Sequence, residues 1–319
     1  MSLPSVFDNL RLPIISAPMF IVSNKELVIE QCKAGIVGSF PSLNARGEGE
    51  FEKWLQEISE QLDRYNQANP DTPAAPFAVN QIVFKSNERL QEDMELCVKY
   101  KVPIIITSLG ANVDVNDAAH SYGGIVMHDV INQRFAHKAI EKGADGLILV
   151  ASGAGGHAGA QSPFALVQET REWFDGPVAL SGCIARGDSI LAAQAMGADF
   201  AYIGSSFIAT EEANAVDEYK TMVVDSDADD IVYSDYFTGV SGNYLKPSFA
   251  ASGMDPDNLP SGDISAMQKL TDQSNNSKAW KDIWGCGQGI GAVDEIQSVA
   301  ERVAQFKSEY IAAKARLAV

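Results

Sequence analysis

The sequence has few of the residues that usually bind metal ions or form covalent cross-links. Its 319 residues include only four histidines and four cysteines. No C-x-x-C pair occurs, so a metal site is not expected. Scattered cysteines instead predict free thiols in a reducing compartment, and the cytoplasm is the expected location. The four cysteines stand at positions 32, 97, 183 and 286.

The sequence also lacks long apolar runs and an excess of basic residues. No run approaches the ~18 apolar residues that a membrane span requires. The start, "MSLPSVFDNLRLP", has no apolar segment followed by a small-residue cleavage site, so we expect neither a signal peptide nor a membrane partner. The net charge of -18 disfavours nucleic acid as a partner. A small-molecule substrate is therefore expected, and a homodimer remains open.

What the sequence does contain is a series of short apolar runs that end in small or polar residues. Near-continuous hydrophobic runs of this length are typical of parallel strands that are buried on both faces. The eight runs are residues 14–19, 36–40, 77–82, 103–109, 124–129, 146–152, 177–182 and 201–206.

Helical patterns alternate with these runs. A glycine ends several of them, and "KGADGLILVASG" (142–153) resembles "MGADFAYIGSS" (196–206), as if one turn were used twice. Strand and helix repeated eight times over about 200 residues predict an α/β fold, a (β/α)8 TIM barrel. The alternative, an open doubly wound sheet, needs a phosphate fingerprint after its first strand, and "APMFIVSN" contains none.

The sequence changes character after residue 215. Residues 216–281 are acidic, rich in turns and weakly periodic, which predicts an inserted lobe covering the substrate. The barrel then comprises residues 1–215 plus 282–319, and 292–318 predict a long helix that packs on it through Ile296, Val299, Val303 and Phe306. Aromatic residues in the lobe either line a substrate pocket or form its own small core: Tyr233, Tyr236, Phe237 and Tyr244.

The active site of such a barrel lies at the carboxyl ends of its strands. Polar or small residues stand at several of these ends, including Ala17, Pro18, Met19, Asn80, Ser108 and His128. The last two strands end in Ser181-Gly182-Cys183 and Gly204-Ser205, where barrels of this kind commonly bind phosphate. The alternative is that these glycines only make tight turns.

The loop "ASGAGGHAGAQSPF" (151–164) places His157 among glycines at the end of the sixth strand. With a pKa near its ordinary value of about 6.5, this imidazole could take a proton from a small substrate. It could equally be a solvated bystander. His128 is interpreted as facing a cofactor or as a polar residue of the barrel interior, whereas His120 and His137 are expected at the surface.

Taken together, these segments resemble the nitronate monooxygenase family, formerly called 2-nitropropane dioxygenases. The resemblance rests on "APM", Asn80, "GADGLILVASGAGGHAG", "SGCIARG", "GADFAYIGSSFIATEEA", "FTGVSGNYLKPS" and "GQGIG", in this order. It implies a barrel that binds FMN without a covalent link, with His157 as the catalytic histidine. It further implies that Ala17 to Met19, Asn80 and His128 border the flavin, that Gly155 and Gly156 let the loop approach its ring, and that residues 181–183 and 204–205 hold its phosphate.

The resemblance thus implies an FMN-dependent oxidation of alkyl nitronates, or nitroalkanes, with O2 to carbonyl compounds and nitrite. The alternative is an NAD(P)H-dependent flavin reductase of quinones or of an enoyl thioester, because such enzymes have similar sequences. In both cases the cofactor carries the redox chemistry, and the protein orients the substrate and handles protons.

Overall fold

The computed structural model describes residues 3–84, 86–236, 239–262 and 283–317. Eight parallel strands form its central sheet in the order β1-β9-β8-β6-β5-β4-β3-β2. A parallel bridge between Ile15 and Val37 joins the two end strands and closes the barrel. The predicted fold class is confirmed, and the eight predicted apolar runs correspond to β1 (Ile14–Ser16), β2 (Gly38–Pro41), β3 (Phe77–Ile82), β4 (Ile104–Ser108), β5 (Ile125–Val130), β6 (Gly146–Val150), β8 (Val178–Ser181) and β9 (Phe200–Ile203).

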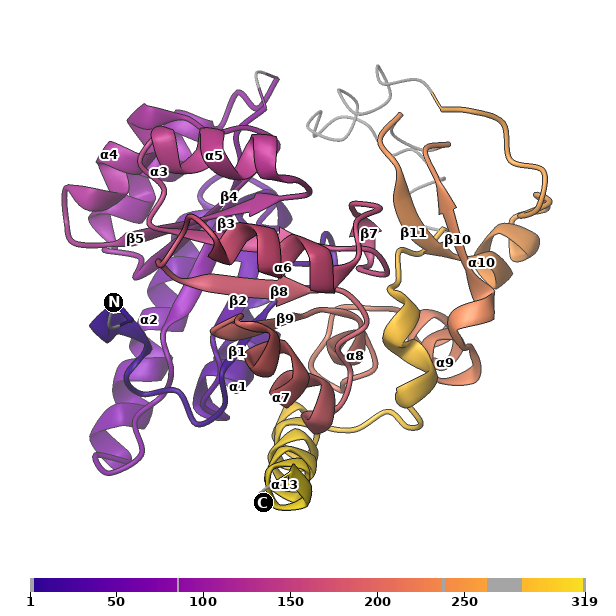
Figure 1. Cartoon of the computed structure of the whole chain (residues 1–319). Coiled ribbons are helices and arrows are strands. Elements are labelled where there is room, and N and C mark those ends of the chain that lie inside the picture. Colours follow the sequence, from indigo (N-terminus) through magenta and orange to yellow (C-terminus); the bar gives the residue numbers. More distant parts are fainter. Residues whose placement is uncertain (1–2, 85, 237–238, 263–282, 318–319) are drawn as a thin grey trace.

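Helices surround this barrel (Figure 1). Those that follow the strands in turn are α1 (Lys25–Lys33), α2 (Glu50–Ala68), α3 (Leu90–Lys99), α4 (Val113–His120), α5 (Gln133–Glu141), α6 (Pro163–Arg171), α7 (Gly187–Met196) and the short α8 (Ser205–Ile208). Asparagine side chains at 24, 112 and 132 accept backbone N–H bonds at the starts of α1, α4 and α5. None of the described helices is long and apolar enough to cross a lipid bilayer.

The repeated Gly-Ala-Asp turn has a physical explanation. Gly143 and Gly197 adopt positive φ angles of 96° and 114°, which end α5 and α7. The aspartate that follows accepts a hydrogen bond from the backbone of the neighbouring strand: Asp145 from Val126 N at 2.7 Å and Asp199 from Val178 N at 2.8 Å. The same three residues therefore end a helix and align two strands in both places.

Apolar side chains pack on both faces of the barrel wall. Ile15, Ala78, Ile106, Met127 and Ile148 point into the barrel and are fully buried. Strand residues of the opposite parity, such as Val79, Ile105 and Val126, pack against the surrounding helices. Because successive side chains of a strand point to opposite faces, this parity decides which polar residues reach the barrel mouth.

The C-terminal helix is shorter than predicted. α13 (Val299–Leu317) begins seven residues after position 292, and Ile296 is 42% exposed instead of packed. Ser298 and Glu301 form a capping box: the Glu301 carboxylate accepts from Ser298 N, and Ser298 Oγ accepts from Glu301 N, which fixes the start of the helix. Val299, Val303 and Phe306 are buried as predicted, and α13 packs against α7.

Residues 217–236 and 239–251 lie beside the barrel (Figure 1) and contain α9 (Asp217–Asp225), η3 (Ala228–Asp230), β10 (Ile231–Ser234), β11 (Gly242–Leu245) and α10 (Lys246–Ala251). β10 and β11 form a sheet with β7 (Gly156–His157), a strand of the glycine loop. The chain then returns through η4 (Gln288–Ala292). Part of the predicted lobe, residues 237–238 and 263–281, lies outside the described residues, and the boundaries at 216 and 281 remain a prediction.

Candidate active site

Three polar side chains form a hydrogen-bonded chain at the carboxyl ends of β3, β4 and β5. Asn80 Nδ2 donates to Ser108 Oγ at 2.7 Å, and Ser108 Oγ donates to Asp129 Oδ2 at 2.6 Å. All three share the parity of the strand residues that fill the barrel interior. Burial raises the pKa of the Asp129 carboxyl to about 6, although the Ser108 bond acts in the opposite direction.

His128 does not lie where the cofactor-facing interpretation requires it. Its neighbours of equal parity, Val126 and Val130, pack with the surrounding helices, and its Nδ1 lies 2.5 Å from Thr107 Oγ1. Burial and the nearby Lys142 charge lower its pKa to about 4. The structure thus corrects this position: the strand alternates, so Asp129 faces the barrel interior and His128 the helix layer.

The glycine loop after β6 extends across the mouth of the barrel. Ala154 and Ala158 belong to the same buried cluster as the interior residues Val150 and Tyr202. The far end of the loop lies next to the last residue of β6, because Gly159 N donates to Val150 O at 3.2 Å. A Cβ atom at Gly159 would lie 3.0 Å from Cβ of Ile131, which follows β5. The loop is therefore packed against the segment after β5 at this residue.

His157 is the second residue of β7, and its backbone is paired with Gly242 of β11. The residue is half-buried. Desolvation by the surrounding protein lowers the pKa of its imidazole to about 4. The sequence-based expectation of a pKa near 6.5 therefore does not hold, and the imidazole is neutral at physiological pH.

The two turns predicted to hold phosphate are brought together with the glycine loop. Ser205 Oγ accepts a hydrogen bond from Gly287 N at 2.9 Å, and Gln288 N donates to Gly153 O at 2.9 Å. Cys183 follows Gly182 in a left-handed conformation, with φ of 56°. The sequence predicts that residues 284–291, a glycine-rich stretch, form a lid loop returning to the mouth. In the structure, residues 286–288 of this stretch connect the turn after β9 to the loop after β6.

Close packing explains why particular turns contain glycine. A Cβ atom at Gly182, where φ is +129°, would lie 2.7 Å from Ser152 O. At Gly204 a Cβ atom would instead lie 3.3 Å from Ala17 Cβ and 3.5 Å from Met19 Sδ. The predicted first-strand segment therefore adjoins the turn after β9.

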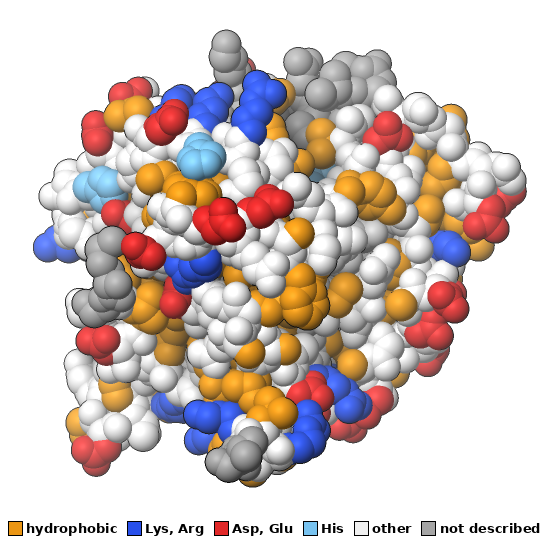
Figure 2. Space-filling model, viewed as in Figure 1, with side chains coloured by type: hydrophobic (Ala, Val, Ile, Leu, Met, Phe, Trp, Pro, Cys, Tyr) orange, Lys and Arg blue, Asp and Glu red, His pale blue; other side chains and the backbone are white. Residues whose placement is uncertain are grey.

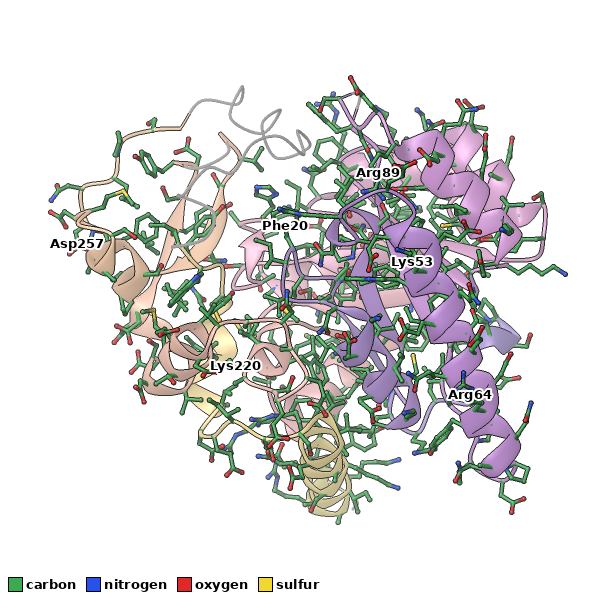
Figure 3. All side chains as sticks on the ribbon, turned by 180° about the vertical axis from the view of Figure 1, so that it is seen from behind. Phe20, Lys53, Arg64, Arg89, Lys220 and Asp257 are labelled. Carbon is green, nitrogen blue, oxygen red and sulfur yellow. The ribbon has the colours of Figure 1, made fainter. Side chains whose placement is uncertain are left out.

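Phe20, which follows this segment, lies on the side of the barrel nearest the lobe in Figure 3, and the Arg46 guanidinium is 5.3 Å from its ring centroid.

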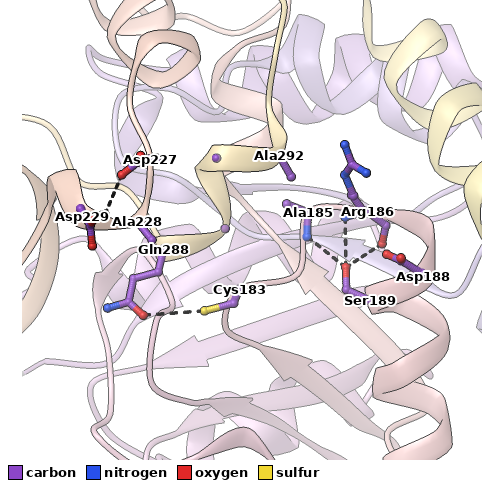
Figure 4. A pocket seen from close by; sticks show the side chains of 12 residues that line it. Cys183, Ala185, Arg186, Asp188, Ser189, Asp227, Ala228, Asp229, Gln288 and Ala292 are labelled. Carbon is purple, nitrogen blue, oxygen red and sulfur yellow. Dashed lines mark hydrogen bonds between the residues drawn. The ribbon is translucent and has the colours of Figure 1, made fainter.

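A pocket of about 520 Å³ lies beside the turn after β8 (Figure 4). Its wall includes Cys183, Arg186, Ser189, Asp227 and Gln288. Cys183 Sγ is 3.9 Å from Gln288 Oε1, and both side chains also lie next to Gly153, so the pocket adjoins the glycine loop. Cys183 is the one predicted site residue that lines this pocket.

Most of the predicted site residues therefore come together in two groups. Asn80 and Ser108 form one group with Asp129. The other contains the first-strand segment, the glycine loop and both turns: Ala17, Pro18, Met19, Gly155, Gly156, His157, Ser181, Gly182, Cys183, Gly204 and Ser205. Strand parity would have pointed to Asp129. Asn243, on β11, is joined to the loop by tertiary contacts that no local pattern reveals.

Among the lobe aromatics, Tyr233 Oη donates to Ala158 O at 2.9 Å, next to His157. Tyr244 is 4% exposed and packs with Phe249 and Ile283 in a small lobe core. Phe237 lies outside the described residues.

The family profile of nitronate monooxygenase matches residues 5–309, which is nearly the whole chain. This chain belongs to the nitronate monooxygenase family. Membership shows that it is an enzyme, a flavin-dependent oxidoreductase, and confirms the resemblance inferred from the motifs.

Individual relatives are distant. The nitronate monooxygenase of Paraburkholderia phytofirmans is 24% identical over 285 residues, 76% of each chain. Rv1533 of Mycobacterium tuberculosis, a predicted monooxygenase, is 26% identical over 231 residues, which are 68% of this chain but only 62% of that relative.

Solved structures support the fold. FabK of Thermotoga maritima is similar with a TM-score of 0.77 at 22% identity, over 99% of both chains. Nitroalkane oxidase of Streptomyces ansochromogenes is similar with a TM-score of 0.76 at 21% identity, over 99% of this chain and all of that one. At these identities the likeness establishes the barrel fold alone.

Proposed function

We propose that the protein binds FMN at the barrel mouth and oxidises alkyl nitronates with O2 to carbonyl compounds and nitrite. The observation that carries this proposal is the position of His157. A neutral imidazole stands on a glycine loop that crosses the mouth. This loop lies against Cys183 of the turn after β8 and is joined to the turn after β9 through residues 286–288.

The residues of these turns fit the phosphate of a flavin. Backbone N–H groups and serine hydroxyls are the donors that phosphate oxygens accept from, and glycine permits a close approach. The hydroxyl of Ser206, 1% exposed, has no hydrogen-bond partner among the described residues. A buried unpaired donor beside the Gly204-Ser205 turn suits an anionic ligand.

FMN would supply the capacity to accept electrons from the nitronate and to react with O2. Residues 181–183 and 204–205 would hold its phosphate, while Ala17 to Met19, Asn80 and Ser108 would border its ring. Gly155 and Gly156 carry no side chain that would keep the loop away from a planar ring.

His157 would act on the substrate itself. A nitronate is already an anion, so the imidazole N–H would bind one of its nitro oxygens. A neutral nitroalkane must first lose its α-proton, which the unprotonated imidazole can accept. The anion formed in that step would stabilise the resulting imidazolium and offset the unfavourable effect of burial.

A second candidate is an NAD(P)H-dependent flavin reductase of quinones or of an enoyl thioester. The pairing of Arg46 with Phe20 favours it, because this exposed cation beside the mouth could contact a dinucleotide phosphate. On the face in Figure 2, basic side chains occur in small groups among acidic ones, so the negative net charge does not exclude local contacts between cations and a phosphate.

The experiment compares reductants and substrates on one preparation. The purified protein should release FMN on denaturation, and anaerobic stopped-flow mixing with an alkyl nitronate should bleach the flavin faster than NADH or NADPH does. Release of FAD, or preferential bleaching by a dinucleotide, would refute the proposal and favour the second candidate.

Replacing His157 by alanine tests the role of the imidazole. We expect turnover of a neutral nitroalkane to fall by about 10²–10⁴-fold, with a smaller loss for pre-formed nitronate, because only the neutral substrate needs a base. His128→Ala is the control, because its ring lies in the helix layer and should not produce this difference. Equal losses on both substrates would exclude a proton-transfer role.

A further inference from the structure

Asn243 connects the lobe to the glycine loop. Its side chain is 2% exposed, and its Nδ2 donates to Ala154 O at 2.7 Å. Its backbone is the β11 partner of Gly156, and its carbonyl accepts from Cys286 N at 3.1 Å. One residue therefore holds the segment that precedes His157 and the segment that returns from the lobe.

The loop depends on such contacts because its own sequence is permissive. Gly153 and Gly156 both adopt positive φ angles, of 83° and 65°, and Gly155 lies between them. Glycine-rich backbone has many accessible conformations, so external bonds must select one. The lobe also holds the far side of His157, where Ala158 N donates to Ser241 O at 3.3 Å.

The chemistry of the Asn243 side chain indicates why an amide is present. Its Oδ1 has no hydrogen-bond partner among the described residues, although the atom is buried. An unpaired buried acceptor is unfavourable, and an apolar side chain of similar size would avoid it. Among the described residues, the bond that Asn243 donates to Ala154 O is the side-chain hydrogen bond that an apolar replacement would lose.

We propose that Asn243 is a positioning residue that sets the place of the His157 imidazole over the barrel mouth. It does so by fixing Ala154 through its side chain and Gly156 through the β11–β7 pairing. The inference rests on the proposed function of His157 for its catalytic consequence, whereas the position of the imidazole can be measured without turnover.

The catalytic test is a double-mutant cycle on the holoenzyme. Asn243→Ala should lower kcat for a neutral nitroalkane by about 10–100-fold, the order expected when a reacting group is misplaced by about 1 Å. In the His157→Ala background the same change should have little further effect, because the residue acts through the histidine. Equal losses in both backgrounds would overturn the proposal.

Asn116 provides a matched control. It is also 2% exposed, its Nδ2 donates to Lys142 O at 2.8 Å, and its Oδ1 is likewise unpaired among the described residues. Because it lies on α4, in the helix layer, Asn116→Ala should cost similar stability and leave kcat unchanged. Should Asn243→Ala fail to fold, Tyr233→Phe removes the bond to Ala158 O from a side chain that is 46% exposed, with about 2–10-fold loss expected.

An independent measurement is the NMR signal of the His157 ring. The chain has four histidines, and the signal missing in His157→Ala identifies the one of interest. Asn243→Ala, or Tyr233→Phe, should shift or broaden that signal, while Asn116→Ala should not. An unmoved signal would refute the positioning role. If the signal moves but His157→Ala turns over normally, the proposed function fails and the positioning inference stands.

Discussion

The ionisation of His157 illustrates how burial changes the chemistry that a sequence suggests. An exposed histidine would be partly protonated at neutral pH, and a protonated imidazole cannot accept a proton. Desolvation lowers the pKa of His157 to about 4, so the base form is the one present over the working range. The cost of this arrangement is a weaker base, which the anionic product must offset.

The first prediction concerns the pH dependence of turnover. With a neutral nitroalkane, kcat/KM should stay high down to about pH 5 and fall as His157 protonates near 4. Brief pH-jump assays would measure this fall in kcat/KM, which should be absent in His157→Ala. A fall in kcat/KM near pH 6.5 in the parent enzyme would show that the imidazole is hydrated, as the sequence alone suggested.

The second prediction concerns Asp129. Its pKa of about 6 in the folded protein exceeds the ordinary value of 3.8, so its contribution to stability is present at low pH and is lost as the pH rises through 6. Asp129→Asn keeps an oxygen for Ser108 and removes the buried charge. The free energy of unfolding of the apoprotein should therefore rise by on the order of 1–2 kcal/mol at pH 7.5.

At pH 4 the same substitution should have almost no effect, because the carboxyl is then protonated in the folded state. Urea denaturation at the two pH values gives both numbers. A loss of stability at pH 7.5 would mean that the ionised carboxylate has a partner in solution.

At the scale of an element, the turns after β8 and β9 look alike in sequence but meet different neighbours. A side chain at 182 would meet the carbonyl of Ser152 at 2.7 Å in a left-handed backbone. At 204 the backbone has an ordinary φ of -113°, and the neighbours are the side chains of Ala17 and Met19.

The third prediction separates these two glycines. Gly182→Ala should destabilise the apoprotein by about 1–3 kcal/mol, because of strain and a backbone contact. Gly204→Ala should change apoprotein stability less and weaken flavin binding, since a methyl group there would press on Ala17 and Met19, which are proposed to border the flavin ring. Thermal unfolding and flavin fluorescence titration distinguish the two. The opposite order of stabilities would contradict the contacts at 182.

At the scale of the whole molecule, barrel and lobe share one apolar cluster. Leu27, Ile203 and Phe207 of the barrel belong to it together with Tyr219 and Leu245 of the lobe segment. The β11–β7 pairing adds a sheet connection between the same two parts. Separating the lobe thus removes packing from the barrel and support from His157.

The fourth prediction is that deletion of residues 216–281, with the ends bridged, leaves a folded barrel of lower Tm that binds flavin but does not turn over. Circular dichroism, flavin content and nitronate oxidation measure the three properties. A deletion variant that is unfolded would show that the predicted boundaries are wrong, and an active one would show that the lobe does not position the loop.

The sequence alone determined the barrel, its eight strands and the gathering of the chemically unusual residues at one end. Strand periodicity, the repeated Gly-Ala-Asp turn and the family motifs are local, so they can be read without coordinates. The Ser298–Glu301 cap sets the start of α13 and leaves Ile296 outside the helix, and the residues of this cap are also visible in the sequence.

Tertiary structure decided which side chains face the site. Strand alternation places Asp129 and His128 on opposite faces, and the packed barrel decided that Asp129 is the one inside. The pKa of His157 and the contact of Asn243 with Ala154 likewise arise between segments far apart in the chain. Desolvation and long-range hydrogen bonds depend on what surrounds a residue in space, and neighbours in sequence do not reveal it.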